Sequence, residues 1–82
     1  MPKHTYSSHN KKLQELLKEI RVDAGMSQVE LSRKLGQHQS FVSKYETGER
    51  RLDLIEIGQI CEALGITLSG FVKRFEKKTN DS

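Results

Sequence analysis

Residues 28–48 read QVELSRKLGQHQSFVSKYETG, and they are the most informative part of the chain. It contains two short segments in which apolar residues recur at the spacing of a helix face. The apolar residues are Leu31, Leu35, Val42 and Tyr45. Their side chains can hold the two segments against each other at a steep angle. Between the segments stands Gly36, which tolerates the positive φ that a tight turn requires. The stretch therefore predicts two short helices joined by a tight turn, the second of them spanning residues 39–47.

Helical spacing continues on both sides of this stretch. Before it, one helix face carries Leu13, Leu16, Leu17, Ile20 and Ala24. After it, one face carries Ile57, Ile60, Cys61 and Leu64, and another carries Leu68, Phe71, Val72 and Phe75. Capping residues predict where three of the helices begin, namely Ser27 with Glu30, Asp53 with Glu56, and Thr67. No segment alternates as a half-buried strand does, so the sequence predicts an all-α fold of five short helices.

The length of 82 residues suits one domain with a modest core. Helical periodicity places this domain at residues 10–77. The polar residues 1–9 are expected to form a flexible arm and residues 78–82 a disordered tail. For Lys3 and His4 a disordered arm is favoured over contact with a partner. The net charge of +3 permits a polyanionic partner but does not demand one.

Several classes of protein are excluded by what the chain lacks. Cys61 is the only cysteine, so no intramolecular disulfide can form, and its place on an apolar stripe predicts a buried, inert thiol. The histidines His4, His9 and His38 are too dispersed for a metal site, and no metal or cofactor is expected. No phosphate loop, pair of catalytic carboxylates or activated nucleophile is present, so the chain is not expected to be an enzyme. Without a secretory signal or a long apolar run, a cytoplasmic, non-membrane protein is expected.

The predicted helix 39–47 keeps polar side chains on the face that does not pack. Gln39, Ser40, Ser43 and Lys44 lie at i, i+1, i+4 and i+5, and side chains of this size fit the major groove of DNA. The alternative is an ordinary solvated face. Phe41 is expected to be half-buried beside Tyr45 rather than to touch a thymine methyl group.

Three basic side chains flank this helix. Arg50 and Arg51 follow it, and they either contact phosphates or are simply solvated. His38 precedes it, and either it contacts a phosphate or it is an exposed turn residue.

From about Leu16 to Phe75 the chain resembles the phage repressor/Cro helix-turn-helix family, also called the XRE family. The matching residues are Arg21, Gly25, Gln28, Leu31, Gly36, Gln39, Ser40, Val42, Glu46 and Gly48. Three positions depart from the family pattern: Ser32 stands where alanine is common, Gln37 where an apolar residue is common, and His38 where a small capping residue is usual. The last two leave the turn geometry open.

The resemblance implies a five-helix, lambda-repressor-like DNA-binding domain. It places Gln39 where the family has an adenine-reading glutamine. A glutamine can read adenine because its carboxamide forms hydrogen bonds to N6 and N7 at the same time. It places Gln28 where a glutamine contacts phosphate and braces that reader. It also places Arg21 and Glu46 where a structural ion pair can join the first and third helices.

Two classes of function remain. The first is a sequence-specific transcriptional regulator, a repressor or autoregulator, that binds an inverted repeat of double-stranded DNA as a homodimer, with apolar positions around Leu52 and the last helix as candidate dimer contacts. A phage-type repressor, an antitoxin autoregulator and a controller of a restriction–modification operon fit equally. The second class is a helical protein-interaction module, such as an antitoxin-like binder of a partner protein, without sequence-specific DNA binding.

Overall fold

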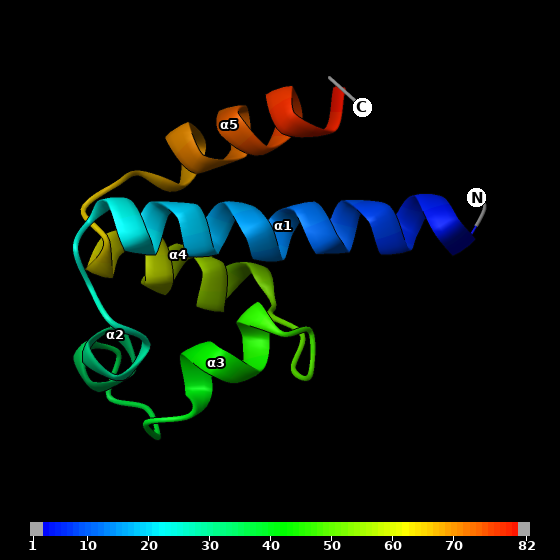
Figure 1. The fold of residues 1–82 in the computed structure, drawn as a ribbon. Coiled ribbons are helices and arrows are strands. Elements are labelled where there is room, and N and C mark those ends of the chain that lie inside the picture. Colours follow the sequence, from blue (N-terminus) through cyan, green and yellow to red (C-terminus); the bar gives the residue numbers. More distant parts are fainter. Residues whose placement is uncertain (1–2, 81–82) are drawn as a thin grey trace.

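The computed structural model describes the backbone of residues 3–80 and the side chains of residues 8–80. This part of the chain forms five helices and no strand (Figure 1). The helices are α1 (Lys3–Asp23), α2 (Gln28–Lys34), α3 (Phe41–Glu46), α4 (Leu54–Ala63) and α5 (Leu68–Asn80). The predicted all-α, five-helix fold is confirmed.

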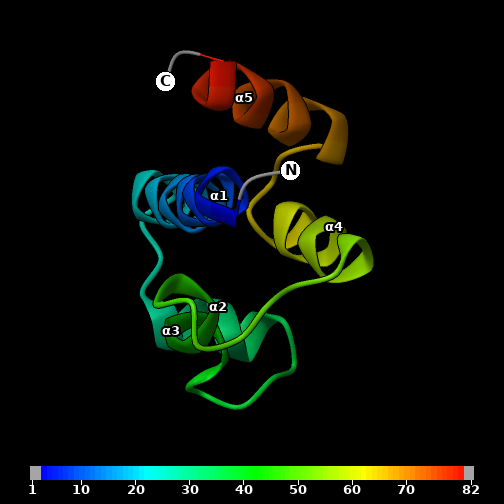
Figure 2. The ribbon, with the colours of Figure 1, turned by 90° about the vertical axis from the view of Figure 1, so that its right-hand side faces the viewer.

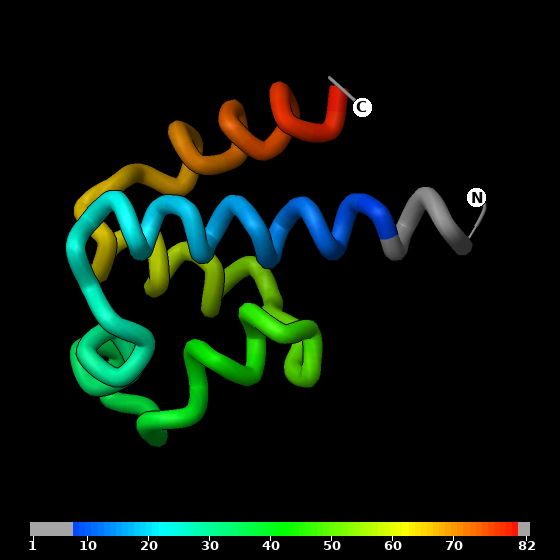
Figure 3. The backbone as a smooth tube through the Cα atoms, in the orientation of Figure 1, coloured from blue at the N-terminus to red at the C-terminus, as the bar shows by residue number. Residues whose placement is uncertain are grey.

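The long helix α1 lies between the other elements. Helix α5 packs on one side of it, and α2 and α3 lie on the opposite side, as two perpendicular views show (Figures 1 and 2). Helix α3 contacts both α1 and α2, and α4 contacts α5. The tube in Figure 3 shows that the chain turns sharply between α2 and α3. This arrangement leaves the α2–α3 unit at one end of the molecule, away from α5.

A single core forms where the helices meet, because every helix contributes buried apolar side chains to it. Its buried members are Leu16, Leu17, Ile20, Leu31, Phe41, Val42, Tyr45, Ile60, Cys61, Leu64 and Phe71. Burying a large apolar side chain contributes about 1.5–3 kcal/mol relative to leaving it exposed. Burial also raises the pKa of the Cys61 thiol, which agrees with the inert thiol predicted from its position on the apolar stripe.

The predicted helix starts are confirmed in atomic detail. The Ser27 hydroxyl accepts a hydrogen bond from the backbone N–H of Glu30 at 3.0 Å, and the Glu30 carboxylate accepts one from the N–H of Ser27 at 2.9 Å. Asp53 and Glu56 form the same reciprocal box at the start of α4. Gly48 ends α3 with φ +84°, and a Cβ there would lie 2.8 Å from the Gln14 amide nitrogen. The backbone conformation therefore favours glycine at this position, whereas the Gln14 amide ends a flexible side chain that can move aside.

The boundaries of three predicted segments were wrong. The arm predicted over residues 1–9 is helical from Lys3, and the tail predicted over residues 78–82 is helical as far as Asn80. No proline or glycine lies within residues 3–9 or 78–80, and a helix whose other turns are packed extends over polar residues at little cost. The helix predicted over residues 39–47 is shorter, at Phe41–Glu46, with Gln39 and Ser40 in the preceding turn. Residues 1–2 and 81–82, and the side chains of Lys3 and His4, lie outside the described residues.

No single helix within residues 3–80 is both long enough and apolar enough to cross a bilayer. Helices α4 and α5 reach that length and composition only when taken together, and the chain bends by 108° between them.

Candidate nucleic-acid interface

Helix α3 is amphipathic, and its inner face is apolar. Phe41, Val42 and Tyr45 are buried, and the rings of Phe41 and Tyr45 meet edge to face, with centroids 5.5 Å apart and planes at 78°. Such aromatic pairs add about 0.5–1.5 kcal/mol to the burial of their area. Phe41 therefore packs beside Tyr45 as predicted, although it is buried rather than half-buried. The side chains left for a partner are the polar ones on the other face.

A buried ion pair fixes the C-terminal end of α3 to α1. The Arg21 Nε and Nη2 atoms donate to the two Glu46 carboxylate oxygens at 2.7 and 3.1 Å. The side chains are only 9% and 3% exposed. Arg21 Nη1 also donates to the Met26 carbonyl at 2.7 Å, so one guanidinium joins α1, the turn after it and α3. The structure thus brings together the two residues that the resemblance paired.

Gln28 belongs to the same cluster. Its amide nitrogen donates to Glu46 Oε1 at 2.9 Å. The resemblance placed Gln28 against Gln39 as a brace, whereas in the structure it holds the start of α2 to the end of α3. The carboxylate explains the difference, because an oxygen that accepts from Arg21 still has a lone pair for the amide.

A second buried contact joins α2 to the start of α3, and it was not predicted from the sequence. Ser32 is fully buried, and its hydroxyl accepts a hydrogen bond from the backbone N–H of Val42 at 3.1 Å. First-turn N–H groups have no partner inside their own helix, so this contact satisfies a buried donor that would otherwise be unpaired. The available signal was a hydroxyl at a position where the family has alanine, since a buried hydroxyl must find a partner.

His38 shapes the turn between the helices. Its ring atom Nδ1 lies 2.8 Å from the Ser40 hydroxyl and accepts from the Ser40 backbone N–H at 3.2 Å. Its carbonyl accepts from the Phe41 N–H at 2.9 Å. These bonds hold Gln39 and Ser40 in a turn, which is the physical reason that α3 begins at Phe41 rather than at Gln39.

The four predicted base-reading side chains lie along this turn and α3. Gln39 and Lys44 are exposed, while Ser40 and Ser43 are half-buried. The Ser43 hydroxyl donates to the Ser40 carbonyl at 3.0 Å, which places the two serines one helical turn apart on the same side. This surface therefore presents the carboxamide of Gln39, the two serine side chains and the ammonium group of Lys44.

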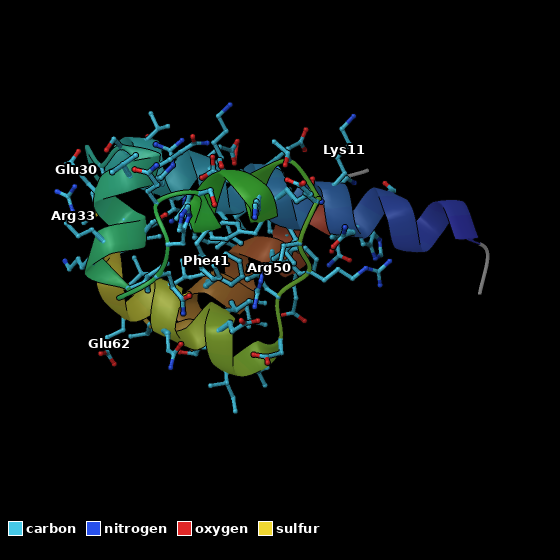
Figure 4. All side chains as sticks on the ribbon, turned by 90° about the horizontal axis from the view of Figure 1, so that it is seen from below. Lys11, Glu30, Arg33, Phe41, Arg50 and Glu62 are labelled. Carbon is cyan, nitrogen blue, oxygen red and sulfur yellow. The ribbon has the colours of Figure 1, made fainter. Side chains whose placement is uncertain are left out.

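The loop after α3 positions Arg50 beside this surface. Its guanidinium lies 4.9 Å from the centroid of the Phe41 ring and bonds to Glu56 at 2.8 Å (Figure 4). The hydrogen bond to Glu56 raises the pKa of Arg50, and the same bond holds the pKa of the Glu56 carboxyl below its ordinary value. The arginine side chain is still 42% exposed, so it is oriented without being buried.

Arg51 lines one pocket with its neighbour Arg50 and with Tyr45 of α3. Arg51 is exposed, and it also lines a second pocket with Leu13, Leu52 and Phe75, on the side of α1 and α5. Arg33 and Lys34 on α2 are exposed as well, and neither was predicted to contact a partner. Within the described part of the chain no three His, Cys, Asp or Glu side chains come together as a metal site would need.

Comparisons with known proteins agree with this geometry. A family model described as helix-turn-helix matches residues 17–71. None of the curated proteins compared with the chain matches it. Among solved structures, an XRE-family like protein from Pseudomonas syringae pv. tomato str. DC3000 is 40% identical with a TM-score of 0.86, and the match covers 92% of each chain.

Structures of the restriction–modification controller protein C.Esp1396I share the fold at lower identity. The wild-type protein is 23% identical with a TM-score of 0.82, over 90% of this chain and 96% of that one. Its tetramer in complex with its natural 35 base-pair operator is 24% identical with a TM-score of 0.78, over 87% and 93% of the two chains.

Proposed function

The chain belongs to the XRE-type helix-turn-helix family, and from this premise we propose that it reads the major groove of an inverted-repeat operator as a homodimer. It is a DNA-binding transcription regulator and not an enzyme. We further propose which residues contact the DNA and how two copies are placed on it.

One observation carries the proposal: α3 is locked on its inner face and polar on its outer face. The Arg21–Glu46 pair and the Ser32–Val42 bond fix the helix to α1 and α2, so its outer face is presented in one orientation. A helix fits a major groove about 12 Å wide. We assign base contacts to Gln39, Ser40, Ser43 and Lys44, with the Gln39 amide suited to N6 and N7 of adenine.

Phosphate contacts are assigned to the side chains that surround this face. Arg50 is held beside the start of α3, and Arg51 and His38 are exposed nearby in the sequence. Gln28 remains in this set, because its amide keeps a second proton and its oxygen while bonded to Glu46. Such contacts release counterions, so binding should weaken steeply as salt is added.

The surface for a second copy is assigned to the start of α4. Leu54 and Ile55 are adjacent and are 65% and 74% exposed, whereas Leu52, the earlier candidate, packs partly against the core. Leu54 and Ile55 directly follow the loop that leaves α3. A twofold symmetry axis next to these two residues would keep the α3 helices of both copies on one side of the duplex. One small module buries little surface on DNA, which favours a dimer with half-sites about 34–36 Å apart.

The proposal is tested by selecting bound sites from random DNA with the purified full chain. We expect an inverted repeat, and for a dimer that makes about 6–10 phosphate contacts a loss of about 10³–10⁵ in affinity between 50 and 200 mM salt. Lys44→Ala should weaken binding, while Lys73→Ala, which removes an equal charge from α5, should not. Failure to bind any duplex at low salt would overturn the proposal and favour the protein-interaction module.

The dimer surface needs a separate measurement. Sedimentation of the Leu54→Ser/Ile55→Ser double variant should show a monomer that binds a half-site and loses tight binding to the full repeat. Val22→Ser, at a position 57% exposed at the end of α1, serves as the control. A double variant that still sediments as a dimer would show that this surface is not the interface.

A further inference from the structure

Two serine hydroxyls on the proposed reading face have their protons engaged inside the protein. The Ser43 hydroxyl donates to the Ser40 carbonyl at 3.0 Å. The Ser40 hydroxyl lies 2.8 Å from His38 Nδ1, a distance at which one of the two atoms must donate to the other. Which atom donates decides what Ser40 can offer to a base.

The backbone of Ser40 settles the direction of that bond. Its N–H donates to the same His38 Nδ1 at 3.2 Å, and a backbone N–H can only donate. Nδ1 therefore carries a lone pair rather than a proton. It follows that the Ser40 hydroxyl donates to Nδ1 and that the ring proton of His38 sits on Nε2.

Three consecutive backbone N–H groups at the start of α3, from Ser40 to Val42, have partners inside the protein. The N–H of Ser40 bonds to His38 Nδ1, that of Phe41 to the His38 carbonyl, and that of Val42 to Ser32 Oγ. A helix start with these donors occupied cannot use them for a phosphate or a base. These three N–H groups are not available to DNA, which leaves the side-chain oxygen of Ser40 as the group that this residue can present.

We propose that His38 is a positioning residue that makes Ser40 an acceptor-only reader of the major groove. Its proton is committed to His38, so the Ser40 hydroxyl keeps only lone pairs to present, and Ser43 is restricted in the same way by the Ser40 carbonyl. In the major groove the donors are the N4 amino group of cytosine and the N6 amino group of adenine, whereas guanine and thymine present acceptors at O6 and O4. Ser40 accordingly selects cytosine or adenine at one position of each half-site. This inference rests on DNA binding through the α3 face, as proposed above.

The test compares four forms of the full chain on every single-base variant of the selected site: wild type, Ser40→Ala, His38→Ala and His38→Asn. Wild type should prefer cytosine or adenine at one position by about three- to tenfold, as a single neutral hydrogen bond allows. Ser40→Ala should abolish that preference alone. His38→Ala frees the hydroxyl proton, so guanine or thymine should be tolerated at the same position. Asparagine can accept from the residue two positions on, so His38→Asn should restore the preference.

A structural role for His38 would give a different pattern. If His38→Ala weakens all base variants equally, or if Ser40→Ala leaves every preference unchanged, the inference is overturned while the proposed function stands. If the wild-type chain binds no duplex, both fall. The ring ¹⁵N shifts of His38 in the free protein at alkaline pH provide a check that needs no variant: a proton on Nε2 is expected, and a proton on Nδ1 would overturn the inference.

Discussion

Two arginine–glutamate pairs flank α3, and they differ in burial rather than in chemistry. Arg21 and Glu46 meet at 2.7 Å with side chains 9% and 3% exposed, and Arg50 and Glu56 meet at 2.8 Å with side chains 42% and 23% exposed. Separating the buried pair leaves a charge without water, whereas either member of the exposed pair can be solvated again. The buried pair therefore holds the fold of the α2–α3 unit, and the exposed pair only orients a side chain beside it.

The largest effect is expected when the buried pair is broken. Arg21→Ala strands the Glu46 carboxylate and should lower the free energy of unfolding by about 3–5 kcal/mol. Arg50→Ala is the matched control, and it should change stability no more than an ordinary surface substitution does. Urea unfolding of both variants measures the contrast. Similar, small losses for the two would mean that burial does not set the difference between the pairs.

A smaller loss of folding stability is expected when the buried hydrogen bond between Ser32 and Val42 is removed. Ser32→Ala leaves the N–H of Val42 buried without its partner, which should cost about 1–3 kcal/mol. Ser8→Ala removes an exposed hydroxyl from α1 and should have almost no effect. Urea unfolding again gives the measurement. Equal stability of the two variants would show that the N–H of Val42 finds another partner.

The sequence was sufficient for the fold and for contacts that depend on local spacing. Ser27 with Glu30 and Asp53 with Glu56 lie three residues apart, so their capping boxes follow from helix geometry alone. The pairing of Arg21 with Glu46 came from the resemblance, because 25 residues separate them and no local rule joins them.

The contacts that sequence reasoning missed depend on the angle between helices. The Ser32 hydroxyl reaches Val42, and Gln28 reaches Glu46 rather than Gln39, only because of how α2 crosses α3. His38 was seen as a departure from the family pattern, but its role depends on the ring orientation, which spacing does not reveal. The helical start of α1 was missed because polar residues give no periodic signal.

The exposed pair, Arg50 with Glu56, should make a small, pH-dependent contribution to the stability of the fold. Arg50 and the backbone of Asp53 hold the pKa of Glu56 below its ordinary value, so the unfolded chain binds this proton at a higher pH than the folded chain does. The contribution is therefore present above the ordinary carboxyl range and is lost as pH falls through the lowered pKa.

Replacing the carboxyl group tests this sign. Glu56→Gln should flatten part of the loss of stability on acidification, while Glu62→Gln, an exposed glutamate on the same helix, should not. Denaturation curves at neutral and acid pH measure the effect. A steeper acid dependence in Glu56→Gln would contradict the assigned direction.

Replacing Gln39, which is exposed in the turn before α3, should have the smallest effect on stability and a specific effect on base recognition. The measurement is binding of Gln39→Ala and Arg51→Ala to every single-base variant of the selected site. Gln39→Ala should lose about ten- to more than a hundredfold discrimination at one base pair per half-site, with nonspecific affinity nearly intact. Arg51→Ala should weaken all sequences alike and flatten the salt dependence. If Gln39→Ala instead weakens every variant equally, the turn and outer face of α3 do not read bases through Gln39, and the assignment of the reading face is wrong.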